Sequence, residues 1–230
     1  MKKYLLSTLA DGICVVLLSV CPILCYASAF SVKLEASVLI MAAVLFSIVF
    51  SLLSAFVKNN LKYALCMTVI AFVAFLVFVF ANERIFAQAN YAINKLLELY
   101  SVYLSVYSNI KFASYIANNA TGFFVLLSLI LNGLFSFLIS RIKSIKIAGL
   151  LSIALLVPCF VLVNTLPDLV PLLIIFTVLF ALYFSSQTRQ LNYAHSGVIT
   201  AVCAVILAVL ITVLAVINPV ADYERPKWQD

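Results

Sequence analysis

Long apolar stretches alternate with short polar ones along most of the chain. The apolar runs span approximately 12–30, 36–57, 63–81, 122–141, 147–164, 169–185 and 197–217. No Asp, Glu, Lys or Arg lies in their interiors, and Arg141 marks the end of the fourth run. About 20 apolar residues can cross the hydrocarbon of a bilayer, and a helix satisfies its own backbone there. The pattern predicts an all-α polytopic membrane protein with about seven transmembrane helices.

One long stretch, 82–121, is polar enough to lie outside these spans. Within it, Ile93, Leu97, Tyr100, Leu104 and Tyr107 step by 4, 3, 4 and 3, which places them on one helical face. Tyrosine is frequent here and prefers the bilayer interface. We therefore expect one or two amphipathic helices on the outer membrane surface, partly over the bundle. A lid or a substrate groove is the functional alternative.

The predicted organisation has four parts. Transmembrane helices 1–3 occupy 1–81, the amphipathic segment occupies 82–121, transmembrane helices 4–7 occupy 122–217, and a polar tail occupies 218–230.

Composition supports the membrane interpretation. Of the 230 residues, 66% are hydrophobic and 10% are charged, whereas about a quarter of the residues in soluble domains are charged. A net charge of +6 in a soluble domain would suggest nucleic acid. Here the bases lie between apolar runs, so we expect the lipid bilayer as the partner and no nucleic acid.

The distribution of bases predicts the orientation in the cell membrane. The loops on one side hold eight bases: Lys2, Lys3, Lys58, Lys62, Arg141, Lys143, Lys146 and Arg189. The short loops on the other side hold one, Lys33. Basic loops face the cytoplasm. The N-terminus is therefore predicted to be cytoplasmic, and seven spans place the C-terminus outside the cytoplasm.

The N-terminus also allows a second interpretation. "MKK", an apolar stretch and "ASA" at 27–29 resemble a secretory signal peptide with its cleavage site. However, Asp11 interrupts the early apolar region, and few residues separate Ala29 from the second span. An uncleaved first helix is the favoured interpretation.

The six cysteines all lie within apolar runs, which excludes a disulfide-stapled exterior within this chain. Cys14, Cys21 and Cys25 share one helical face, as a metal or redox site would require. Burial as small apolar side chains is the favoured interpretation.

Polar and small residues inside the spans indicate helix packing. Ser128, Asn132, Ser136 and Ser140 form a polar stripe on the fourth span. Ser47, Ser51 and Ser54 on the second span are a candidate counterpart, and the seventh span carries a small-residue seam of Gly197, Ala201, Ala204, Ala208 and Ala215. An amide in lipid needs a partner, so we expect Asn132 to face other helices, near the second or seventh span, within hydrogen-bond distance of protein. A transport path is the alternative to this packing role.

The sequence contains no pattern typical of catalysis. His195 has no Cys, Asp or Glu nearby in sequence, and no phosphate loop, H-E-x-x-H pair or G-x-S-x-G elbow occurs. We therefore predict no catalytic residue, no cofactor, no metal and no catalytic activity for this chain.

Two short strings carry a resemblance to a known family. "PCFVLVNTLPDLVPLL" (158–173) and "YERPKWQD" (223–230), with the basic-flanked spans, resemble the N-terminal membrane region of bacterial membrane-anchored transglutaminase-like proteins. In that family the helices precede an extracytoplasmic papain-like domain with a Cys-His-Asp triad. The resemblance implies that this chain is the membrane anchor, and that 218–230 begins a linker to a transglutaminase-like cysteine enzyme domain absent from it.

The triad has no counterpart here, because every cysteine is predicted to be intramembrane and His195 cytoplasmic. Two alternatives remain at this point. One is a small membrane transporter or channel, and the other is an assembly subunit that binds other membrane subunits through the seventh span.

Overall fold

The computed structural model describes residues 2–57, 59–104, 117–142, 144–161 and 167–190. The chain divides into two compact units, Met1–Leu179 and Phe180–Asp230. Of the second unit, only 180–190 belong to the described residues, so the account below concerns the first unit.

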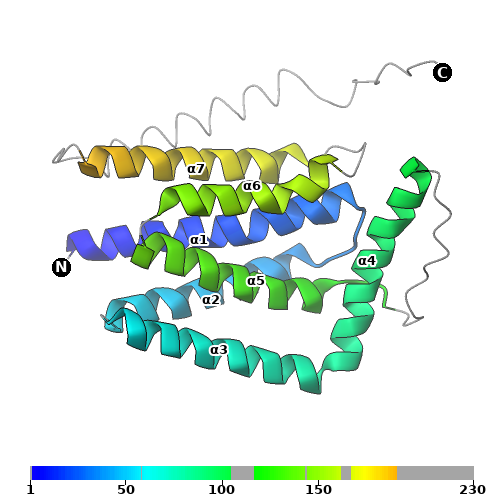
Figure 1. Cartoon of the computed structure of the whole chain (residues 1–230), viewed down its shortest axis with the longest axis horizontal. Coiled ribbons are helices and arrows are strands. Elements are labelled where there is room, and N and C mark those ends of the chain that lie inside the picture. Colours follow the sequence, from blue (N-terminus) through cyan, green and yellow to red (C-terminus); the bar gives the residue numbers. More distant parts are fainter. Residues whose placement is uncertain (1, 58, 105–116, 143, 162–166, 191–230) are drawn as a thin grey trace, which may run out of the picture. The chain divides into compact units, whose positions relative to one another are not determined.

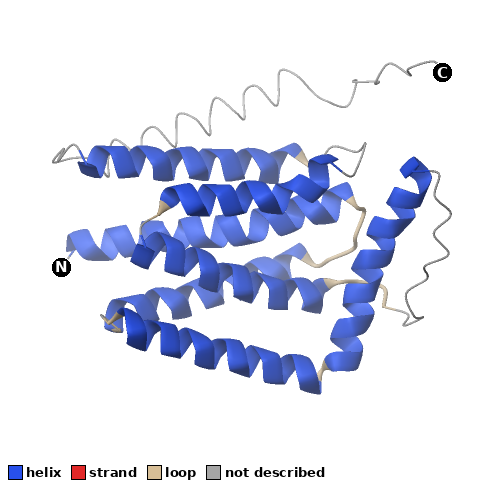
Figure 2. Ribbon diagram, in the orientation of Figure 1, coloured by secondary structure: helices blue, strands red, loops and turns tan. Residues whose placement is uncertain are grey.

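Every regular element among the described residues is a helix, as Figure 2 shows, which confirms the predicted all-α class for this part of the chain. The elements are α1 (Lys2–Ala29), α2 (Ala36–Phe56), α3 (Asn60–Phe80), α4 (Asn82–Leu104), α5 (Thr121–Ser136), the π-helix η1 (Phe137–Ile142), α6 (Ile145–Val161) and α7 (Leu169–Gln190).

Among the described residues, four helical stretches are long and apolar enough to cross a membrane. They are Asp11–Ala29, Ala36–Phe56, Asn60–Phe80 and Thr121–Ile142, which match the first four predicted spans. Ile145–Phe160 and Leu169–Phe184 are shorter apolar helices at the predicted fifth and sixth spans. The predicted seventh span and its seam, from Gly197 to Ala215, lie outside the described residues. The described helices are therefore those of a membrane protein with four clear candidate spans.

Helix α5 lies at the centre of the first unit. It packs most extensively against α2 and also against α1, and α1 in turn packs against α6 (Figure 1). A Cβ on Gly133 would lie 2.8 Å from Met67 Cε of α3 and 3.4 Å from Phe50 Cζ of α2. The missing side chain thus permits close approach of three helices, as small residues do in membrane bundles.

Helix α3 is mostly exposed, whereas α5 is largely buried among other helices. All of its residues are described, and only Tyr63 among them is buried. Its large apolar side chains, including Leu65, Val69 and Phe72, are exposed. A surface this apolar is rare on a soluble monomer and is consistent with contact to the bilayer.

Helix α4 runs crosswise to the neighbouring helices of this unit at one end, as Figure 1 shows. It starts directly after α3, and the rings of Phe78 and Phe86 lie 5.1 Å apart across the corner. The predicted amphipathic helix is therefore present over Asn82–Leu104.

The side of α4 that packs on protein is not centred on the predicted apolar face. Ile93 is 38% exposed, whereas Ile85 and Ala92 are buried. Ile85 and Ala92 mark the side that packs on protein, and Gln88, between them in the sequence, bonds to Phe123 N of α5. Periodicity finds an apolar face but does not tell whether protein or lipid covers it. The side chains of Tyr100 and Leu104, and all of Tyr107, lie outside the described residues.

The fourth predicted span ends differently from a simple α-helix. Its last six residues form η1, in which the turns are wider than α-helical turns. π-helical turns are uncommon and are often found at functional sites. In this chain the turn carries Arg141, whose contacts are described below.

Candidate functional site: polar contacts between helices

Side chains from other helices cap the starts of three helices at the end of the unit where α4 lies. Gln88 Oε1 of α4 accepts a hydrogen bond from Phe123 N of α5 at 2.9 Å. Thr121 Oγ1 of α5 accepts one from Glu35 N, at the start of α2, at 3.0 Å. Ser28 Oγ of α1 accepts one from Asp168 N, just before α7, at 3.0 Å. The first amides of a helix have no partner within it, so each cap satisfies an otherwise open donor.

We name this region the capped end and define it by residues 28–35, 88–91, 119–123 and 168. Its loops are also joined directly, because Ala120 N donates to Lys33 O at 3.0 Å. Side-chain caps between sequence-distant helices hold the positions of helix ends, since one hydrogen bond constrains two elements at once.

Gly122 has a specific role in the capped end. A Cβ at this position would lie 2.6 Å from Gln88 Oε1, which is too close for an undisturbed contact. The same amide group reaches Asn119, with Gln88 Nε2 at 3.4 Å from Asn119 Oδ1. The absence of a side chain at Gly122 therefore allows Gln88 to reach the start of α5.

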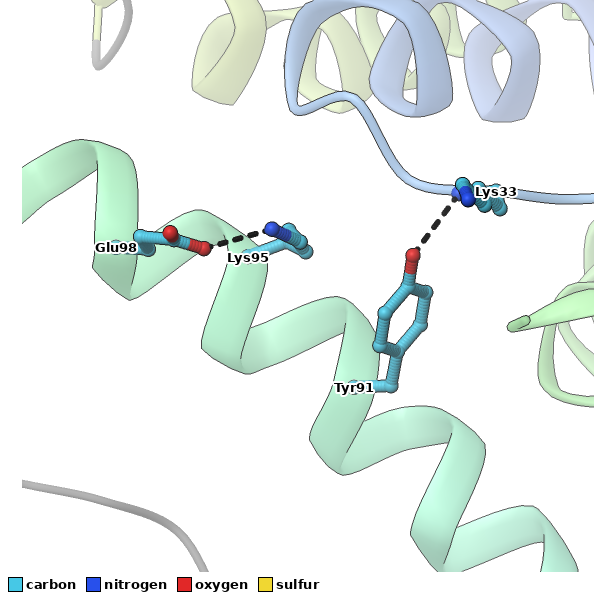
Figure 3. A network of polar contacts seen from close by, with 4 residues as sticks. All are labelled: Lys33, Tyr91, Lys95 and Glu98. Carbon is cyan, nitrogen blue, oxygen red and sulfur yellow. Dashed lines mark hydrogen bonds and ion pairs between the residues drawn. The ribbon is translucent and has the colours of Figure 1, made fainter. Parts of the chain in front are cut away.

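Two further contacts of α4 are drawn in Figure 3. The Tyr91 hydroxyl points to the loop before α2 and accepts from Lys33 N at 3.5 Å. Lys95 Nζ and Glu98 Oε2 lie 2.8 Å apart on exposed side chains of α4. The hydrogen bond to Glu98, and then its charge, raise the pKa of Lys95 above its ordinary value.

The polar stripe of the fourth predicted span lies inside the bundle. Ser128, Asn132 and Ser136 of α5 are buried, and Ser140 in η1 is half-buried. Asn132 Nδ2 donates to Ser19 Oγ of α1 and to Ser128 O of its own helix, both at 2.9 Å. The partner helix is therefore α1, whereas the expectation was the second or seventh span. The stripe faces α1 because α5 packs against both α1 and α2.

The other oxygen of this amide has an unusual environment. Asn132 is fully buried, and its Oδ1 atom has no hydrogen-bond partner among the described residues. A buried amide oxygen without a donor costs roughly 1–3 kcal/mol in proteins. Ser19 Oγ does not supply that donor, because it donates to Val16 O at 2.9 Å.

The serines of α2 do not pair with the stripe as expected. Ser47 Oγ donates to Gly12 O of α1 at 2.9 Å. A Cβ on Gly12 would lie 3.2 Å from Ser51 Oγ, so α1 and α2 approach closely at this glycine. Ser47 of α2, expected to pair with the stripe on α5, therefore bonds to α1 instead. The bond is possible because Gly12 has no side chain to cover its carbonyl group.

At the opposite end of these helices, Arg141 joins two turns. Its Nη2 atom donates to Ser54 O at 3.0 Å and also to Val57 O, both at the C-terminal end of α2. The guanidinium carbon lies 4.7 Å from the centre of the Tyr63 ring. A cation at a helix C-terminus is favoured by the helix dipole and by unpaired carbonyl groups.

Tyr63 completes this cluster from the first turn of α3. Its ring stacks on Phe137 with centroids 6.1 Å apart, and its hydroxyl lies 3.3 Å from Ser136 Oγ. We name this region the basic end and define it by the described residues 54–57, 59–63, 136–142 and 144–146. Sequence reasoning treated Arg141 only as a loop charge, because neither spacing nor composition shows which carbonyl groups an arginine will meet.

The cysteines are placed as small interior side chains. Cys21, Cys25 and Cys159 are buried, Cys14 and Cys66 are half-buried, and Cys203 lies outside the described residues. Among the described residues, no group of three or more His, Cys, Asp or Glu is arranged to hold a metal ion. His195 also lies outside the described part of the chain.

Comparison with protein families, with curated proteins and with solved structures finds no match to this chain. A functional interpretation therefore depends on the geometry above. That geometry fixes helices against one another through Ser19–Asn132, Ser47–Gly12, Tyr63–Ser136 and the Arg141 contacts.

Proposed function

We propose that this chain is a multi-pass membrane anchor that holds an extracytoplasmic domain at the outer face of the membrane. The observation that carries the proposal is that polar side chains within the apolar helices make hydrogen bonds and close polar contacts between helices. Asn132, Ser47 and Ser136 each bond or contact a group on a different helix. An anchor needs a bundle with fixed geometry, and interhelical hydrogen bonds provide it at roughly 0.6–2 kcal/mol each.

The proposed topology has seven spans, with the basic end in the cytoplasm and the capped end outside. The excess of bases in the turns 57–62 and 141–146 supports this orientation. Helix α4 would then lie on the outer surface, where its tyrosines match the preference of that residue for the interface. The C-terminal tail would lead away from the outer face.

The carried domain is proposed to be transglutaminase-like. The support is the resemblance of 158–173 and 223–230 to the membrane region of such proteins. Part of the first string and all of the second lie outside the described residues. Under this proposal the cysteine chemistry belongs to the carried domain, and the helices position that domain at the membrane surface.

Reporter fusions test the anchor and its orientation together. Alkaline phosphatase, active only outside the cytoplasm, and a fluorescent protein, active only inside, would be fused after Lys62, Lys146 and Asp230. The expected signals are inside, inside and outside, and the Asp230 fusion should stay in the membrane fraction after alkaline extraction. An inside signal at Asp230, or release of that fusion by alkali, would refute the proposed anchor.

A further inference from the structure

The basic end brings together two loops that are far apart in the sequence. Arg141 of η1 bonds to the carbonyl groups of Ser54, in the last turn of α2, and of Val57, directly after it. Lys62 precedes Tyr63, on whose ring the guanidinium lies, and Lys146 follows in the first turn of α6. Two basic turns thus form one surface, at the left of Figure 1.

This surface has a large excess of positive charge. In the sequence, the segments 57–62 and 141–146 contain five bases and no acid. Lys62 and Lys146 are exposed, and within the described residues neither makes an ion pair. Lys58 and Lys143 lie outside the described residues. Like charges held close together repel one another, so an anion that binds here is favoured.

An apolar surface starts directly beside these charges. Leu61 is 71% exposed and Leu65 is 59% exposed, one turn apart on α3. A ligand with an anionic head and an acyl chain would contact the lysines and this face of α3 at once. Inorganic phosphate would use only the lysines, and an acidic peptide would leave the apolar face uncovered. The combination therefore fits a phospholipid.

We propose that Lys62 and Lys146 at the basic end bind the phosphate headgroups of anionic phospholipids, with acyl chains along α3. Lysine ammonium groups and phosphate oxygens form charge-assisted hydrogen bonds. A basic residue near an anionic membrane contributes roughly a fivefold change in affinity. Arg141 positions the two turns, because its guanidinium is engaged by the end of α2. This inference does not depend on what the anchor carries.

The test uses the full chain in nanodiscs made of zwitterionic lipid with an increasing fraction of phosphatidylglycerol. Lipid retained on the protein is measured by native mass spectrometry, and thermal unfolding is measured in parallel. The test variant is Lys62→Gln with Lys146→Gln. The matched control is Lys33→Gln with Lys95→Gln, which removes two lysines from the opposite end of the helices.

Wild type and the control should retain phosphatidylglycerol selectively and unfold at a higher temperature as its fraction rises. The Lys62/Lys146 variant should bind it about 25-fold more weakly, from a factor of roughly five per lysine. Equal retention by the two variants would overturn the proposal. So would an equal rise in unfolding temperature with inorganic phosphate in zwitterionic nanodiscs. Failure of the anchor proposal would be seen in the reporter fusions and not here.

Discussion

The capped end and the basic end of the same helices are held in different ways. At the capped end, several neutral side chains each satisfy one backbone amide of another helix, through Gln88, Thr121 and Ser28. At the basic end, one charged side chain, Arg141, bonds to two carbonyl groups of α2 and lies on an aromatic ring. At the capped end the contacts between helices are spread over three side chains, whereas at the basic end several of them depend on one side chain.

The two ends also differ in charge, because the numbers of bases and acids are similar at the capped end and unequal at the basic end. The described segments 30–36, 81–104, 117–121 and 167–168 on the capped side contain three bases and four acids. In the sequence, segments 57–62 and 141–146 at the basic end contain five bases and no acid. A balanced end is held by its own hydrogen bonds, whereas an end with excess charge depends more on what surrounds it. The comparison predicts that a single substitution lowers the free energy of unfolding most at the basic end.

The largest effect is expected for Arg141→Ala. The change removes the hydrogen bonds to Ser54 O and Val57 O and the contact with the Tyr63 ring. Loss of a charged hydrogen bond costs about 1.5–3 kcal/mol, so we expect the free energy of unfolding to fall by about 3 kcal/mol. Reversible unfolding of the purified chain in mixed micelles measures this value.

Arg141→Lys is the matched control. Lysine keeps the charge near the C-terminus of α2 but lacks the planar fork that reaches two acceptors. It should recover about half of the loss. If Arg141→Ala cost no more than a typical capped-end substitution, the contrast between the two ends would be wrong.

The next effect concerns Gln88 and Gly122 at the capped end. Gln88→Ala leaves Phe123 N without its cap and should cost about 1 kcal/mol, as loss of a helix cap usually does. Gly122→Ala displaces the same side chain, because its Cβ would lie 2.6 Å from Gln88 Oε1. Alanine favours a helix over glycine by up to about 1 kcal/mol, so Gly122→Ala alone should cost only about 0.5 kcal/mol.

The double variant gives a sharper test than either single change. Once Gln88 is alanine, Gly122→Ala has nothing to displace and only the helix preference remains, so it should stabilise by about 0.5 kcal/mol. The sign of the Gly122 effect thus reverses between the two backgrounds in a double-mutant cycle. Simple additivity of the two changes would show that Gly122 does not serve the Gln88 contact.

The sequence was sufficient to predict the helices but not most of their mutual contacts. Apolar length located the first four spans, and the polar composition of 82–121 located α4, because both properties are local. It did not predict that Arg141 would reach the end of α2, or that Gln88 would cap α5. Such contacts join residues more than 30 positions apart and depend on how helices rotate against each other.

Asn132 shows both the success and the limit of sequence reasoning. A buried amide in a membrane span must find a partner, and the structure places one at Ser19. Which helix supplies it depends on the rotation of α5, and the expected helix was wrong. The seam on the seventh span and the orientation of the termini remain predictions.

A smaller effect is expected for Asn132→Leu, between the two ends. The variant loses the hydrogen bond to Ser19 Oγ, worth about 0.6–1.7 kcal/mol in membrane proteins. It also removes the buried Oδ1 atom, which has no hydrogen-bond partner in the described part of the chain, and so relieves a comparable cost. The free energy of unfolding should change by less than about 1 kcal/mol. Asn132→Ala, which adds a cavity to the same loss, is the control and should cost more.

The smallest effect is expected for Lys95→Met, on the exposed face of α4. The Lys95–Glu98 pair lies between side chains that are 37% and 66% exposed, where such pairs contribute about 0–1 kcal/mol. The pKa of Lys95 is raised, first by its hydrogen bond to Glu98 and then by that charge. A raised pKa means that the contribution is complete below the unfolded value of about 10.4 and is lost as the pH rises through the folded value. Wild type and variant should therefore unfold with the same free energy, within about 0.5 kcal/mol, at every pH from about 6 to 9. A pH-dependent difference inside that window would mean that Lys95 does more at the capped end than pair with Glu98.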